Sequence, residues 1–86
     1  MVATHKFQIH AECPMVAHKQ WDYYTVSVQT EDTIDVHYLE SVMESVRGIR
    51  ATQEQIGEII RQQMTCEAII EIVGRHSQNS ETNVLA

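Results

Sequence analysis

The spacing of apolar residues changes along this chain, and that change constrains the fold more than any other feature. In residues 5–13 apolar and polar side chains alternate, with Phe7, Ile9, Ala11 and Cys13 on one face. A period of two predicts a half-buried β-strand. Pro14 follows and has no backbone donor, so we expect the strand to end there.

A second strand is predicted after the loop of residues 14–20. Residues 21–30 are rich in aromatic and β-branched side chains, which favour strands. Tyr24, Val26 and Val28 share one face of this segment, and polar residues occupy the other. The two strands therefore form a hairpin with one buried and one polar side.

From residue 36 the apolar spacing becomes helical. The first stripe consists of Val36, Leu39, Val42, Met43 and Val46. Thr33 and Asp35 are candidate N-caps, Arg47 is placed in the last turn, and Gly48 ends the helix. In a second helix Thr52 and Gln55 have capping-box spacing, ahead of the stripe Ile56, Ile59, Ile60 and Met64.

The remaining sequence predicts a third strand over residues 68–73, ended by Gly74. The polar tail, residues 75–86, is expected to form a short edge strand or a segment that docks on a partner. The order ββααβ, with the last β-strand left open, predicts an α+β fold in which two antiparallel helices pack on one face of a mainly antiparallel sheet. At 86 residues the chain is expected to be a single domain, residues 1–86, that gains stability by forming oligomers.

The net charge and the search for targeting signals limit the classes of partner and the cellular location that the sequence predicts. The net charge is −6 and the six cations are scattered, whereas nucleic acids are bound by clustered positive charge. Direct nucleic-acid binding is therefore not expected. No apolar run approaches the roughly 18 residues of a membrane span and no export signal is visible. The sequence thus predicts a cytoplasmic protein without membrane contact, whose partner is a protein or a second copy of itself.

Four potential metal ligands occur within a short N-terminal stretch: His5, His10, Cys13 and His18. Zinc needs four ligands that converge in a tetrahedron. On a strand, however, His10 points away from both His5 and Cys13. Exposed histidines with one buried thiol are the simpler interpretation, so no metal is expected, although binding by His10, Cys13 and His18 is left open.

The other chemical signals are weaker. Cys13 lies in a loop near His18, whereas Cys66 follows the C-terminus of a helix, where a thiolate is not stabilised. The glycines are isolated, so no phosphate-binding loop is present and no cofactor is expected. We assign no catalytic residue from the sequence. The acidic residues Glu31, Asp32, Asp35, Glu40 and Glu44 form either a solvated face or a docking surface for a basic partner.

Four residues are predicted to form a contact surface. Met15 and Val16 are consecutive apolar residues in a loop, and Trp21 and Tyr23 lie on the polar side of the second strand. Exposed aromatic and apolar side chains often anchor interfaces.

The predicted element order resembles the tunnelling fold of pterin and purine enzymes, in which a hairpin, two helices and a second hairpin form a unit that oligomerises into a barrel. Members such as the 6-pyruvoyl-tetrahydropterin synthases carry zinc-binding histidines, including an HxH before the second strand. Here the corresponding residues are Lys19, Gln20, Trp21 and Asp22, with only His18 nearby. The resemblance therefore concerns topology, and we transfer no residue roles.

Two functions follow from these observations. The first is a small non-enzymatic protein for interaction or assembly, acting through the aromatic and apolar loop–strand surface and an edge strand. The alternative is a small oligomeric enzyme or ligand-binding protein of tunnelling-fold-like architecture, with an inter-subunit site that uses His10, His18 and a carboxylate.

Overall fold

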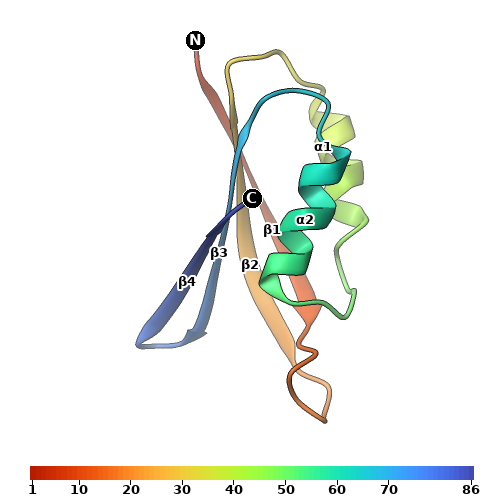
Figure 1. The fold of residues 1–86 in the computed structure, drawn as a ribbon, viewed down its shortest axis with the longest axis vertical. Coiled ribbons are helices and arrows are strands. Elements are labelled where there is room, and N and C mark those ends of the chain that lie inside the picture. The colour runs from red at the N-terminus through yellow and green to blue at the C-terminus, as the bar shows by residue number, and fades with distance from the viewer.

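The computed structural model describes the backbone of residues 1–86 and every side chain except that of His76. The elements in chain order are β1 (Ala3–Glu12), β2 (Trp21–Thr30), α1 (Val36–Glu44), α2 (Gln53–Gln63), β3 (Ile69–Ser77) and β4 (Ser80–Leu85). The strands form one antiparallel sheet in the order β1-β2-β3-β4, and both helices cover one of its faces (Figure 1). The predicted α+β fold is confirmed, and the C-terminal strand that was left open is present.

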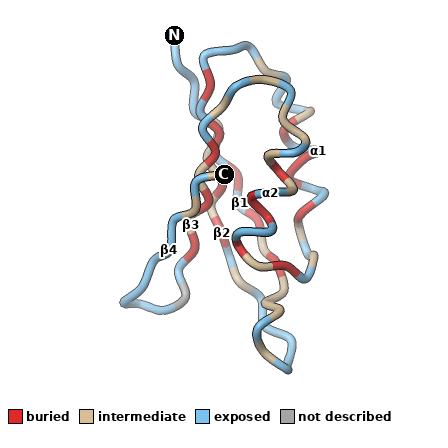
Figure 2. The backbone as a smooth tube through the Cα atoms, in the orientation of Figure 1, coloured by how far each residue is buried: buried red, intermediate tan, exposed pale blue. Residues whose placement is uncertain are grey.

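The hairpin of β1 and β2 follows the alternation in the sequence. Ile9 pairs with Tyr24 and Phe7 with Val26, so their side chains meet on the helix side of the sheet. These four residues are buried, and buried residues, red in Figure 2, alternate with more exposed ones along both strands. We call the opposite side, which no helix covers, the open face.

The strand β3 is longer than predicted, because Gly74 continues it rather than ending it. Gly74 pairs with Tyr24 of β2, and a side chain at this position would lie 2.6 Å from the Tyr24 ring. The glycine is therefore required for packing and not for a turn. The ladder between β3 and β4 becomes irregular between Arg75 and Ser77, beside the turn that leads into β4.

Helix α1 begins at its predicted cap, where the Asp35 carboxylate accepts from the His37 amide at 2.9 Å. It ends at Glu44, before Arg47. The Ser45 hydroxyl donates to the Val42 carbonyl at 2.6 Å and so competes with the helical pattern. Gly48 has the left-handed backbone expected after a helix, with a φ of 79°.

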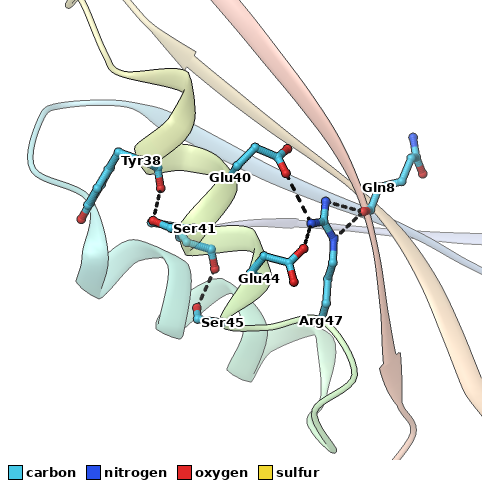
Figure 3. Close-up of polar contacts among 8 residues, drawn as sticks. Gln8, Tyr38, Glu40, Ser41, Glu44, Ser45 and Arg47 are labelled. Atoms are coloured by element: carbon cyan, nitrogen blue, oxygen red, sulfur yellow. Dashed lines mark hydrogen bonds and ion pairs between the residues drawn. The ribbon is translucent and has the colours of Figure 1, made fainter.

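Arg47 joins the end of α1 to the sheet instead of sitting in the last helical turn (Figure 3). Its Nε and Nη2 atoms donate to the Gln8 carbonyl of β1 at 3.2 and 3.1 Å, and Nη1 contacts the carboxylates of Glu40 and Glu44. The hydrogen bond and charge of Glu44 raise the pKa of Arg47. This contact fixes the linker between the helices against the edge of β1.

Helix α2 has the predicted capping box, because the Thr52 side chain accepts from the Gln55 amide and the Gln55 side chain accepts from the Thr52 amide. The apolar stripes of both helices pack on the sheet; Leu39, Met43, Ile56 and Ile60 are fully buried. No helix among the described residues has the length and apolar character needed to cross a membrane.

Candidate functional site

A cavity of about 410 Å³ lies where the start of α2 meets the ends of the strands that carry the loop of residues 14–20. Most of its polar lining comes from three separate segments of the chain. Cys13 follows β1, Asp22 and Tyr24 belong to β2, and Gln53 and Glu54 form the first turn of α2. The fold thus gathers a thiol, two carboxylates, a phenol and an amide in one place.

Cys13 is fixed by the backbone around it. Its amide donates to the Gln20 carbonyl at 2.9 Å, which closes the loop between β1 and β2. The thiol is free and partly exposed. A half-exposed thiol in a cavity is accessible to a ligand while its backbone stays in place.

The linker between the helices holds the residues on either side of Cys13. The Glu12 amide donates to the Ile49 carbonyl at 2.7 Å. Arg50 donates through Nη1 to the Glu12 carboxylate at 2.6 Å and through Nη2 to the Pro14 carbonyl at 3.2 Å. Because this linker leads directly into α2, the same contacts set the position of Cys13 relative to that helix.

Asp22 and Tyr24 are two residues apart on β2 and face the helix side together. The Tyr24 hydroxyl donates to Asp22 Oδ2 at 3.4 Å. Burial raises the pKa of Tyr24 to about 12, assisted by the charges of Asp22, Cys13 and Glu54. The phenol therefore stays protonated near neutral pH, and groups that carry negative charge surround it.

Gln53 is 4% exposed and anchors α2 to both strands of the second hairpin. Its Nε2 atom donates to the Ile72 carbonyl at 2.8 Å and to the Thr82 carbonyl at 2.7 Å. Both amide hydrogens are thus used. The other polar atom of this side chain is the acceptor Oε1, and Gln53 lines the cavity.

The positive end of α2 also lies at this cavity, because Thr52, Gln53 and Glu54 all line it. A helix N-terminus stabilises negative charge on a neighbouring group. The cavity therefore combines a nucleophile, a carboxylate able to carry a proton, hydrogen-bond acceptors for a ligand, and a dipole that favours developing negative charge.

The candidate metal ligands are not brought together. His5 and His10 lie on opposite faces of β1, His18 is exposed in the loop, and Cys13 belongs to the cavity. Within the described part of the chain, no three His, Cys, Asp or Glu side chains are close enough to hold a metal ion. The His10 and His18 pair suggested for an inter-subunit site does not line the cavity.

The four predicted interface residues are placed at two locations. Met15 is 80% exposed and lines the cavity, and Val16 is half-buried in the same loop. Trp21 and Tyr23 lie on the open face beside His10, with ring centroids 5.1 and 6.3 Å from the His10 ring. Their role as an interface stays a prediction.

Sequence reasoning missed Asp22, Gln53 and Glu54 as site residues. A signal for Asp22 was present, since it shares a strand face with the buried Tyr24. It also lies one residue beyond Trp21, which pairs with Glu12 next to Cys13. No local pattern links Gln53 or Glu54 to Cys13, because only the packing of α2 on the sheet brings them together.

Comparisons with known proteins place the fold. No family model matches the chain, and no curated protein matches it. Among solved structures it is similar to the crystal structure of the archaeosine synthase QueF-Like in the apo form, with a TM-score of 0.79 and 16% identity over 99% of this chain and 90% of that chain.

This comparison corrects the first functional prediction. A non-enzymatic interaction protein was expected, but the structural neighbour is an enzyme, and a mainly apolar cavity with a few polar groups is the kind of feature that an enzyme needs. The prediction is wrong, and the alternative of an enzyme or ligand-binding protein is favoured. The chain shares the fold of the archaeosine synthase QueF-Like.

Proposed function

We propose that this chain is a small oligomeric enzyme whose active site is the cavity between Cys13 and the start of α2. One observation carries the proposal: Cys13, Asp22 and Gln53, from three separate elements, line a single cavity. The structural neighbour, an archaeosine synthase, supports an enzymatic role for this architecture. A reactive thiol also requires a reducing environment, which fits a cytoplasmic location.

The chemistry that suits the cavity is addition of the Cys13 thiol to an unsaturated, electrophilic carbon of the ligand. A bond forms between Sγ and that carbon, and one pair of the multiple bond moves to the ligand's heteroatom. The thiol proton passes to Asp22 and from there to that heteroatom. The step needs no further reactant, and the positive end of α2 stabilises the negative charge that develops.

The acceptors in the cavity indicate the ligand. Gln53 offers only Oε1, and Glu54 offers a carboxylate. A ligand edge with an amino group and a ring N–H would donate to both. Guanine and pterin rings have such an edge, in line with the resemblance to pterin and purine enzymes.

We propose that a second copy of the chain forms the remaining wall of the site. The cavity is open to solvent at the exposed Met15, and β4 is an edge strand whose outer side pairs with no described residue. Exposed edges invite pairing with another chain. Trp21 and Tyr23 on the open face, with Met15 and Val16, are the proposed contacts.

The test combines ligand binding with detection of a covalent adduct. Guanine, pterin and their derivatives with an electrophilic substituent are screened by thermal shift, and intact-mass spectrometry follows the protein. We expect stabilisation by ring compounds with a donor edge, and an adduct that disappears in Cys13→Ser but persists in Cys66→Ser. Light scattering is expected to give the mass of an oligomer. Binding without any adduct in the whole panel would contradict the proposed enzyme.

A further inference from the structure

We propose that Tyr24 is a positioning residue, whose hydroxyl holds the Asp22 carboxylate in place beside the Cys13 thiol. The inference deepens the proposed function and rests on it. Three observations support it: how the ring is fixed, what its hydroxyl can do, and which charges surround it.

The ring of Tyr24 is buried and closely packed against β3. Tyr24 is 3% exposed and lies over Gly74, where even a methyl group would come within 2.6 Å of its Cδ1 and Cε1 atoms. Gln53 Oε1, from α2, lies 3.4 Å from the same methyl position at Gly74. A ring packed this closely has one position, so its hydroxyl has a defined direction.

The hydroxyl acts as a donor. The phenol stays protonated, because its pKa is raised to about 12. It donates to Asp22 Oδ2 at 3.4 Å, which is longer than in a tight O–H···O bond. Hydrogen bonds of unliganded sites are often long and shorten when the ligand binds. Asp22 thus already accepts a hydrogen bond from Tyr24 before the ligand binds.

The charged groups around the hydrogen bond between Tyr24 and Asp22 determine how this bond affects Cys13. The groups that act on the Tyr24 hydroxyl are Asp22 from β2, Cys13 after β1 and Glu54 from α2, and each is negative in its ionised form. An unrestrained Asp22 carboxylate would repel the thiolate of Cys13. A hydrogen bond from Tyr24 offsets part of the Asp22 charge and fixes where it lies.

Tyr38 provides the control. Its hydroxyl donates to the Gln63 carbonyl at the C-terminal end of α2, and Tyr38 does not line the cavity. A general effect of removing one tyrosine hydroxyl would appear in Tyr38→Phe as well. An effect that belongs to the cavity appears only in Tyr24→Phe, which keeps the packed ring.

The experiment measures the rate at which iodoacetamide alkylates Cys13 in the full chain, in a Cys66→Ser background. We expect Tyr24→Phe to slow alkylation at least about threefold and Tyr38→Phe to leave it unchanged. In an Asp22→Asn background, Tyr24→Phe is expected to have no further effect, because it acts through the carboxylate. An equal slowing in both backgrounds, or none in either, would overturn the proposal.

Two further measurements separate a failure of the proposed function from a failure of the role proposed for Tyr24. If Cys13 of the starting protein is not alkylated at all, the proposed function fails, whereas an additive cycle with a reactive Cys13 refutes only the role of Tyr24. If Tyr24→Phe does not fold, ultraviolet titration of the phenol in Asp22→Asn replaces it. The pKa of Tyr24 is then expected to fall below about 12, and an unchanged value would refute the contact.

Discussion

Arg50 reaches from the linker between the helices to the Glu12 carboxylate, with 2.6 Å between Nη1 and Oε2. Its second nitrogen donates to the Pro14 carbonyl at 3.2 Å. The Arg50 guanidinium therefore binds the chain on both sides of Cys13, at Glu12 and at Pro14. Lysine has the same charge but lacks the planar fork needed to hold both acceptors.

Replacing Arg50 is expected to loosen the turn around Cys13 more than it destabilises the protein. The ion pair is about half exposed on the arginine side, so solvent screening limits the loss in Arg50→Ala to about 0.5–1 kcal/mol. Amide hydrogen exchange at Cys13 is expected to accelerate in both Arg50→Ala and Arg50→Lys. Arg47→Ala, which releases Gln8 instead, is the control, and equal acceleration there would contradict a specific role.

Most of the fold could be predicted because its signals are local. The alternation in β1 and β2, the Asp35 cap and the Thr52 capping box each depend on residues within one element. One of the errors has a local cause and the other does not. Ser45 ends α1 early by bonding to the Val42 carbonyl, whereas Gly74 serves the packing of Tyr24 on the neighbouring strand rather than a turn.

The site could not be predicted in the same way, because its residues meet only after the sheet and helices have packed. Cys13 and Asp22 are joined by the hairpin register, which depends on the conformation of the intervening loop. Gln53 reaches them through its hydrogen bonds to the Ile72 and Thr82 carbonyls. These bonds cross elements, and no spacing in the sequence encodes them.

Gly74→Ala is expected to destabilise the protein by about 1–3 kcal/mol through overpacking. The new methyl group would lie 2.6 Å from two carbons of the Tyr24 ring, and the buried ring has little room to move. In Gly57→Ala the nearest atoms lie at 3.1 and 3.2 Å, and the gain in helix propensity of about 1 kcal/mol offsets the crowding. Urea denaturation compares the two variants, and equal losses would contradict the special role of Gly74.

The stability of the protein is expected to fall at alkaline pH because of Tyr24. Its pKa is raised from the ordinary 10.0 to about 12, so the unfolded chain loses this proton first as the pH rises. The contribution is fully present below pH 10 and is lost as the pH approaches about 12, by about 2–3 kcal/mol. Urea denaturation of Tyr24→Phe across this range should show a loss smaller by that amount. Tyr23→Phe should follow the unmodified protein, and identical curves for both variants would count against the buried phenol.

Gln53→Glu is expected to be more destabilising than an isosteric exchange ordinarily is. The Nε2 atom of Gln53 donates to two carbonyls, of Ile72 and Thr82, and a carboxylate in its place cannot donate to either. Two carbonyls lose their partner while a negative charge enters a nearly buried position, for a loss of about 2–4 kcal/mol near neutral pH. Because protonating the new carboxyl removes its charge and restores one donor, the difference from the unmodified protein should shrink as the pH falls toward about 4. Gln62→Glu, on the exposed face of α2, changes the net charge equally and should have little effect. Urea denaturation at both pH values measures all three proteins, and a Gln53→Glu variant as stable as Gln62→Glu would show that these two hydrogen bonds do not anchor α2.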